Sequence, residues 1–171
     1  MKLNCDLGES FGAWSMPVES AIMAEIDQAN IACGFHAGDP LVMKQALFLA
    51  KTHGVAVGAH PAYPDLQGFG RRSMAIASDE LNAMLQYQVS ALSGMAALYG
   101  VNVTYVKPHG ALYNDMMKNA EVRRTVMQSI AEINASSTGA PLTLMVQATA
   151  QNAALKEEAK GWELPLYFEA F

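Results

Sequence analysis

The sequence has little charge for its length, and its 16 acidic residues outnumber its 11 basic ones. Charged residues make up 16% of the 171 residues and hydrophobic residues make up 51%, whereas average soluble domains are roughly 25% charged. This composition supplies enough apolar surface for a buried core and excludes an intrinsically disordered chain. The formal net charge is −5. Because nucleic-acid binding needs a basic surface, no nucleic-acid partner is expected.

Long apolar runs, an apolar leader and a cysteine framework are also missing. No window approaches the run of about 18 apolar residues that spans a bilayer, and the opening MKLNCDLGES has no signal-peptide core. We therefore expect no membrane association. Cys5 and Cys33 lie in short apolar runs and form no C-x-x-C pair. We interpret them as buried, reduced thiols of a cytoplasmic protein.

Short apolar runs alternate with stretches of helical period along the whole chain, which predicts one domain over residues 1–171. The expected strands cover residues 3–7, 30–35, 55–59, 103–106, 142–146 and 164–168. The expected helices cover 40–53, 78–100, a stretch capped by Asn119, and a weaker stretch from Thr149 to near Gly161. Strands that alternate with helices predict a parallel sheet, either open and doubly wound or closed as a β/α barrel.

Four of the expected strands end in an ionisable residue: Asp6, His36, His60 and His109. The carboxyl ends of parallel strands meet at one edge of a sheet, where α/β enzymes build their active sites. We therefore predict that these four side chains converge on one pocket. They are also a possible set of ligands for a divalent ion, although their spacing neither requires nor excludes a metal.

Side-chain parity favours the barrel over the open sheet. Residues two apart on a strand share a face, which places Asn30 with His36, if that strand stays extended, and Lys107 with His109. The opposite face is apolar. An open sheet covered on both faces would be apolar at both parities, so the pattern predicts a barrel with a polar lumen.

Each of these histidines is followed within a few residues by an acid: Asp39, Asp65 and Asp115. The simplest interpretation of Asp39 is a helix N-cap, and Asp65 and Asp115 are typical of turns. Arg71 lies in Gly68-Phe69-Gly70-Arg71-Arg72, which has the guanidinium groups to hold a carboxylate or phosphate. No P-loop motif occurs.

At these same motifs the chain resembles the LamB/YcsF family, whose members form the A subunit of the prokaryotic ATP-dependent 5-oxoprolinase. The similar segments are residues 3–9, 29–39, 54–61, 64–65, 69–71 and 106–114. Members of the family continue past the segment that Glu169-Ala170-Phe171 resembles, so we expect this chain to lack the family's C-terminal third. We also expect its last strand to expose Leu164, Leu166 and Phe168, because no helix follows it.

The resemblance implies a seven-stranded β/α barrel of the polysaccharide-deacetylase type, incomplete at the C-terminus. It implies opening of the 5-oxo-L-proline lactam to L-glutamate, coupled to hydrolysis of ATP with Mg²⁺, and partner subunits B and C. On this interpretation Asp6, His60 and His109 are the candidate base and proton shuttle.

The remaining site candidates would bind substrate. His36, Asn30 and Lys107 would position the carbonyl and the carboxylate, Arg71 would hold a phosphate or the carboxylate, and Asp39 would lie among the binding residues. Two alternatives stay open at this point. One is a stand-alone metal-dependent amidase or deacetylase, and the other is a non-catalytic protein that binds the lactam for the rest of the complex.

Overall fold

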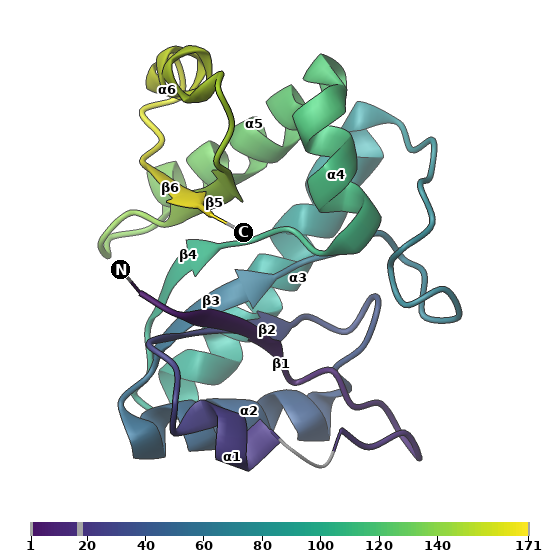
Figure 1. Cartoon of the computed structure of the whole chain (residues 1–171), viewed down its shortest axis with the longest axis vertical. Coiled ribbons are helices and arrows are strands. Elements are labelled where there is room, and N and C mark those ends of the chain that lie inside the picture. The colour runs from purple at the N-terminus through teal and green to yellow at the C-terminus, as the bar shows by residue number, and fades with distance from the viewer. Residues whose placement is uncertain (1, 17–18, 171) are drawn as a thin grey trace.

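The computed structural model describes residues 2–16 and 19–170, which form an α/β fold (Figure 1). The strands are β1 (Asn4–Leu7), β2 (Gln28–Ala32), β3 (Ala56–His60), β4 (Val103–Val106), β5 (Thr143–Gln147) and β6 (Leu166–Glu169). The helices are α1 (Glu19–Met23), α2 (Pro40–His53), α3 (Ser78–Leu98), α4 (Gly110–Lys118), α5 (Ala120–Ser136) and α6 (Asn152–Lys160).

All six strands are parallel and pair with their neighbours in chain order, from β1 to β6. The sheet is curled, so that its two edges approach each other. Lys107, directly after β4, contacts both Asp6 on β1 at 3.2 Å and Glu169 on β6 at 2.8 Å. The predicted parallel β/α architecture is confirmed in this form: the six strands make a curled half-barrel with helices on its outer face (Figure 1).

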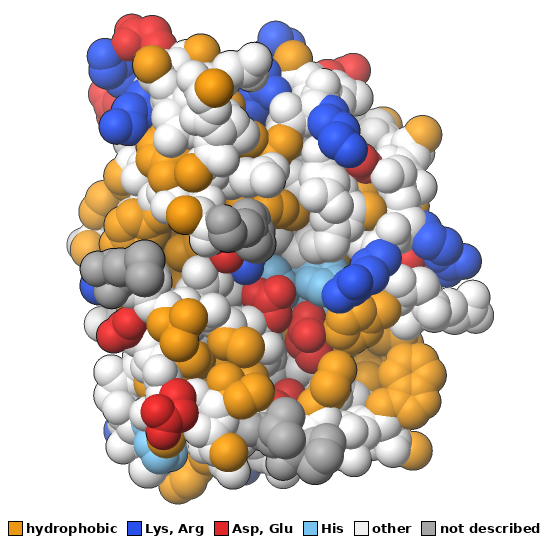
Figure 2. Space-filling view, viewed as in Figure 1, with side chains coloured by type: hydrophobic (Ala, Val, Ile, Leu, Met, Phe, Trp, Pro, Cys, Tyr) orange, Lys and Arg blue, Asp and Glu red, His pale blue; other side chains and the backbone are white. Residues whose placement is uncertain are grey.

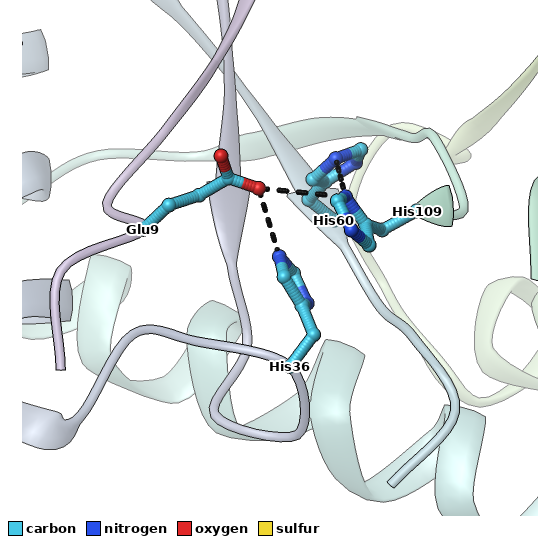
Figure 3. A group of neighbouring side chains, drawn as sticks. All are labelled: Glu9, His36, His60 and His109. Atoms are coloured by element: carbon cyan, nitrogen blue, oxygen red, sulfur yellow. Dashed lines mark hydrogen bonds and ion pairs between the residues drawn. The ribbon is translucent and has the colours of Figure 1, made fainter. Parts of the chain in front are cut away.

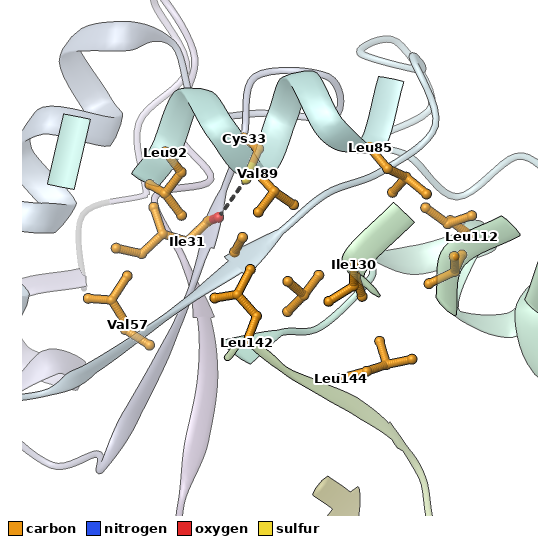
Figure 4. Packing of buried hydrophobic residues seen from close by; sticks show 14 of the residues in the cluster. Ile31, Cys33, Val57, Leu85, Val89, Leu92, Leu112, Ile130, Leu142 and Leu144 are labelled. Carbon is orange, nitrogen blue, oxygen red and sulfur yellow. Dashed lines mark hydrogen bonds between the residues drawn. The ribbon is translucent and has the colours of Figure 1, made fainter. Parts of the chain in front are cut away.

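The main core lies between the outer face of the sheet and the helices. Ile31, Val57 and Val106 project from β2, β3 and β4 into this layer and are at most 1% exposed. They meet Leu92 of α3 and Ile130 of α5, among other apolar side chains (Figure 4). Each such side chain contributes about 1.5–3 kcal/mol when fully buried, so the apolar parity of the strands fixes which face the helices cover.

Helix boundaries follow local capping chemistry. Asp39 accepts hydrogen bonds from the backbone N–H groups of Leu41 and Val42, and Pro40 occupies the first turn of α2. Gly54 ends the same helix in the left-handed conformation that glycine adopts without strain. Asn119 caps α5 in the way Asp39 caps α2. The predicted starts of these two helices are confirmed.

Three sequence expectations differ from the structure. The strand expected over 30–35 runs over Gln28–Ala32, because the chain turns at Gly34, which has a φ of +96°. The short helices α1 and α4 were not expected. The last strand is also less bare than expected: Leu164 is only 5% exposed, and Leu166 and Phe168 are half-buried against the core, because α6 packs on β6.

Within residues 2–16 and 19–170, no helix has the length and apolar character needed to cross a membrane. Both cysteines are free thiols: Cys33 is buried and Cys5 is half-buried. Burial raises the pKa of the Cys33 thiol to about 12. The prediction of buried, unpaired thiols is therefore confirmed for Cys33, whereas Cys5 is unpaired but only half-buried.

Candidate active site at the carboxyl ends of the strands

Three histidines lie together in a hollow at the carboxyl ends of β2, β3 and β4. His36, His60 and His109 are at most 3% exposed, and the histidine side chains visible in the hollow are flanked by acidic and basic groups (Figure 2). His60 ends β3 directly, and His109 follows β4 after Lys107-Pro108. His36 arrives by the turn after β2 and not on an extended strand.

Backbone carbonyls decide which nitrogen of His60 and of His109 carries the proton. His60 donates from Nδ1 to the carbonyl of Lys107 at 2.6 Å, and His109 donates from Nε2 to the carbonyl of Phe69 at 2.9 Å. A carbonyl only accepts, so in the neutral rings His60 Nε2 and His109 Nδ1 bear lone pairs. These two nitrogens lie 2.9 Å apart and face each other.

Glu9 joins the histidines from the loop after β1 (Figure 3). Its Oε1 lies 2.9 Å from His36 Nε2 and 3.4 Å from His109 Nδ1. The rings of His36 and His109 stack, with centroids 3.7 Å apart and planes 6° from parallel. His36 Nδ1 is buried and has no hydrogen-bond partner among the residues described. One atom from each of Glu9, His36, His60 and His109 lies within 4.8 Å of the others.

Asp6 connects this cluster to a polar network in the lumen. Its Oδ2 lies 3.3 Å from His60 Nε2, and its Oδ1 lies 3.2 Å from the ammonium of Lys107. Lys107 also pairs with Glu169 at 2.8 Å, and Glu169 accepts a second hydrogen bond from the hydroxyl of Tyr113 at 2.9 Å. Lys107 therefore links two carboxylates from opposite edges of the curled sheet.

Asn30 lies beside Asp6, and hydrogen bonds fix both ends of its side-chain amide. Its amide nitrogen donates to Asp6 Oδ1 and Asn4 Oδ1, both at 2.7 Å, and its oxygen accepts from the hydroxyl of Tyr105 at 2.6 Å. Gly58 makes room for Tyr105, because a Cβ at that position would overlap the tyrosine ring. This small residue on β3 therefore lets a large polar ring fill the lumen.

A loop between β3 and α3 supplies the outer wall of the histidine cluster. Phe69 adopts a φ of +54°, which is unusual for a residue with a Cβ. The strained conformation aims its carbonyl at His109, while its ring packs edge-on against His36 and His109. A Cβ on Gly70 would lie 2.8 Å from side-chain atoms of both histidines. Backbone strain at this loop thus serves the geometry of the site.

The buried setting controls the charges. Burial is the main reason that the pKa values of His36 and His109 fall to about 3, with the charge of His60 acting in the same direction. Burial also raises the pKa of Glu9, against the opposing effect of His60 and His109. For Asp6 burial is outweighed by His60 and Lys107, and its pKa lies well below the usual range. At neutral pH Asp6 is a carboxylate and His36 and His109 are neutral.

The structure brings together most of the predicted site residues. Asp6, His36, His60, His109, Asn30 and Lys107 all lie in or beside the cluster. Arg71 is exposed, with its guanidinium 5.6 Å from the centre of the Phe69 ring. Asp39 lies elsewhere: it caps α2 and accepts from the N–H of Gly12 at 2.8 Å, so its grouping with the binding residues is not supported by the geometry.

The acids that follow His60 and His109 in sequence also stay out of the cluster. Asp65 is buried against Arg72 and the N–H of Gly68. The hydrogen bond from Arg72 holds the pKa of Asp65 at about 2. Asp115 accepts from Tyr63 and Ser73 at 3.2 Å and 3.0 Å. Asp65 holds a loop, as its interpretation as a turn residue predicts. Asp115 lies within helix α4, so its interpretation as a turn residue is wrong.

Two carboxylates of the site were not among the sequence candidates. Glu9 follows the first strand by two residues, and only the fold reveals that its side chain turns back to His36. Glu169 shares its parity on β6 with Tyr167, whose ring lies 6.2 Å from that of Tyr105 in the lumen. Strand parity therefore carried a signal for Glu169, while nothing local marked Glu9.

Known proteins are similar to this chain over nearly all of its residues. The chain is 52% identical over 169 residues to the second 5-oxoprolinase A subunit of Pseudomonas putida and 54% identical over 169 residues to the third such subunit of Pseudomonas aeruginosa. These alignments cover 99% of this chain and 64% and 65% of the relatives, so the chain spans a little under two thirds of their length.

A solved structure is similar throughout the chain. The crystal structure of the lactam utilization protein from Thermus thermophilus matches with a TM-score of 0.89 and 42% identity, over 100% of this chain and 66% of that one. A model of the LamB/YcsF family matches residues 1–171. With this match over every strand that carries the site, the chain belongs to the LamB/YcsF family.

Proposed function

We propose that the chain acts in the hydrolysis of a lactam, the opening of 5-oxo-L-proline to L-glutamate, as the A subunit of a 5-oxoprolinase. The names of the relatives support the substrate class. The observation that carries the chemistry is a chain of close contacts in the hollow: Asp6 Oδ2 lies 3.3 Å from His60 Nε2, which lies 2.9 Å from His109 Nδ1, which lies 3.4 Å from Glu9 Oε1. Four atoms that bear lone pairs or negative charge meet there, as the activation of a water molecule requires.

In this reaction water adds across the amide bond of the ring. The oxygen of water bonds to the carbonyl carbon, the C–N bond breaks, and a proton moves to the nitrogen, which leaves as the amine of glutamate. The attacking water has to lose a proton, and the developing negative charge on the carbonyl oxygen has to be stabilised by donors. The histidine cluster fits the first task, and the donors around Asp6 fit the second.

Lys107 and Asn30 are the candidate donors. Both are buried and both already point into the lumen beside Asp6. Lys107 is bound to Asp6 and Glu169, which fixes its position before a substrate arrives. Arg71 is the exposed cation beside the cluster, and we assign it to the carboxylate of the substrate or to a phosphate.

We propose that the reaction is coupled to hydrolysis of ATP with Mg²⁺ and needs partner subunits B and C in the cytoplasm. A lactam carbonyl is a poor electrophile. Transfer of the terminal phosphoryl group of ATP to its oxygen, with ADP leaving, would make the carbonyl carbon more electrophilic. Water addition and C–N cleavage would then leave an acyl phosphate, from which a second water releases phosphate and the carboxylate of glutamate. The sequence has no P-loop, so we assign part of the ATP handling to the partners. We further propose that the full family fold is a seven-stranded barrel of the deacetylase type.

The test is an assay of glutamate formed from 5-oxoproline. The chain, a full-length relative and each with subunits B and C would be incubated with 5-oxoproline, with and without MgATP. We expect glutamate and ADP to appear together only in the complete mixtures that contain the partners. Glutamate formed by the chain alone, without ATP, would instead support a stand-alone amidase. Turnover that persists when the histidine cluster is removed would support a protein that only binds the lactam.

A further inference from the structure

We propose that Glu9, His60 and His109 bind a divalent transition-metal ion of the zinc type, with His36 holding Glu9 in place. Binding of the ion does not depend on the proposed function, and only the catalytic role assigned to the ion rests on it. An ion bound here would lower the pKa of a bound water and so favour the nucleophile that lactam opening needs.

The hydrogen bonds behind the two rings are the first argument. Histidines that bind metals nearly always donate their other N–H to a carbonyl or carboxylate, which fixes the tautomer. His60 and His109 each do so, to the carbonyls of Lys107 and Phe69. The remaining nitrogens face each other at 2.9 Å, and a hydrogen lies between them only when one of the rings is doubly protonated. A cation bound by both lone pairs would take the place of that proton.

The spacing of the acceptor atoms is the second argument. His60 Nε2, His109 Nδ1 and Glu9 Oε1 include neighbouring pairs at 2.9 Å and 3.4 Å. Ligands of a tetrahedral zinc ion with bonds of about 2.0–2.1 Å are roughly 3.3 Å apart. The side chains that approach here are imidazole and carboxylate, which suit zinc-like ions. Small adjustments would therefore complete such a site.

Charge is the third argument. Three carboxyl groups meet in this part of the lumen, those of Asp6, Glu9 and Glu169, and Lys107 is the cation that contacts two of them. Among these groups, three carboxylates against the one ammonium of Lys107 leave an excess of negative charge if all are ionised, and the neighbouring guanidinium of Arg71 is exposed. Buried charges need partners, and a divalent ion beside Glu9 and Asp6 supplies positive charge where it is lacking.

His36 is assigned a positioning role because of its orientation. Its ring is stacked parallel to His109 at 3.7 Å, so in-plane lone pairs of the two rings run side by side and do not meet at one point. Its Nε2 instead contacts Glu9 Oε1 at 2.9 Å. Figure 3 shows Glu9 reaching across to both histidines from the opposite side of the hollow.

Cobalt(II) titration tests the proposal without any lactam assay. Protein stripped with a chelator would be titrated with Co²⁺ while the visible absorption is recorded, and bound metal would be counted after dialysis. We expect about one ion per chain with the intense bands of a low-coordinate site. Glu9→Gln and His60→Ala should weaken binding by more than the roughly 10–100-fold that loss of an outer partner costs.

His53→Ala is the matched control, because His53 is the fourth histidine and lies exposed at the end of α2. It should bind Co²⁺ as the parent does. Glu9→Gln keeps the size of the side chain, so its circular dichroism should match the parent even if His60→Ala misfolds. Absence of stoichiometric binding by the parent, or equal binding by Glu9→Gln, would overturn the proposal. A failure of 5-oxoproline turnover would leave this result unchanged.

Discussion

Two sets of three acids surround the histidines, and they behave differently. Asp39, Asp65 and Asp115 follow the histidines closely in sequence, yet they bind backbone N–H groups, hydroxyls and an arginine in the surrounding loops. Asp6, Glu9 and Glu169 come from distant parts of the chain, yet they lie in the lumen beside the histidines and Lys107. We call these the outer acids and the inner acids.

The difference shows what nearness in sequence means in a parallel barrel. A residue a few positions after a strand usually lies in the loop, where it satisfies local backbone donors. A residue at the carboxyl end of another strand, such as Asp6 or Glu169, shares the lumen whatever its distance along the chain. Glu9 joins them from a loop, because its side chain turns back to His36. The inner acids are therefore expected to matter for chemistry and charge balance, and the outer acids for the stability of loops and helices.

Removal of the lumen cation should have the largest effect on stability. Lys107→Met removes the ammonium group that pairs with Asp6 and Glu169, so the two carboxylates repel each other. Breaking a buried ion pair on one side costs about 3–5 kcal/mol, and we expect a loss of that size in urea unfolding. Lys160→Met is the control, because its pair with Glu157 is exposed and should contribute at most about 1 kcal/mol. Equal losses in the two variants would refute the inner network.

Acid should weaken the metal-free fold next. The pKa values of His36 and His109 are about 3 in the folded chain against about 6.5 when unfolded. The unfolded chain therefore binds more protons below pH 6.5, and stability present above that pH is lost as the pH falls toward 3. Between pH 7 and pH 5 the loss should be about 2–4 kcal/mol in urea unfolding with a chelator present. His109→Gln should roughly halve this slope, and an unchanged slope would contradict the burial argument.

The substitution Gly58→Ala, which adds a methyl group, should cause the third largest loss of stability. It would overlap the ring of Tyr105, which donates to Asn30 at 2.6 Å. Overpacking of this kind costs about 1–3 kcal/mol, so we expect a lower melting temperature for Gly58→Ala. Gly94→Ala is the control: Gly94 is an exposed position in α3 with open space around its Cβ site. The control should gain about 0.5–1 kcal/mol, and a stable Gly58→Ala would show that the ring is free to move.

An outer acid should give the smallest effect. Asp39→Ala removes the N-cap of α2 and should cost about 1 kcal/mol in unfolding experiments. Asp39→Asn keeps an accepting oxygen and should lose less. Neither change should alter 5-oxoproline turnover by more than about twofold, because Asp39 has no contact with the histidines. A large loss of turnover in a correctly folded variant would show that Asp39 does contribute to substrate binding.

Much of this fold was predictable because its signals are local. The apolar parity of Ile31, Val57 and Val106 indicated the covered face, and the Asp39-Pro40 start and Gly54 end of α2 are short-range capping chemistry. The helix α4 escaped prediction, since it begins directly after His109 without a side-chain cap. The strand expected over 30–35 was also too long at its C-terminal end, because the chain turns at Gly34.

The site was predictable only in part, for the same physical reason. Residues at strand ends, such as His60 and Lys107, are placed by topology and could be assigned to one edge. Glu9 and the carbonyl of Phe69 are placed by loop conformation, which depends on contacts distant in sequence. The tautomers of His60 and His109 follow from those carbonyls, so the facing lone pairs appear only once the fold is known.

The comparison of inner and outer acids leads to one decisive measurement. It is the rate of glutamate formation from 5-oxoproline, with MgATP and subunits B and C, for Glu9→Gln and His60→Ala beside Asp39→Asn and His53→Ala. We predict losses of at least about 100-fold for the first two, the scale of a removed acid–base or nucleophile-activating group. The second two should keep the parent rate within about twofold. Normal turnover in folded Glu9→Gln and His60→Ala would contradict the assignment of this hollow as the active site.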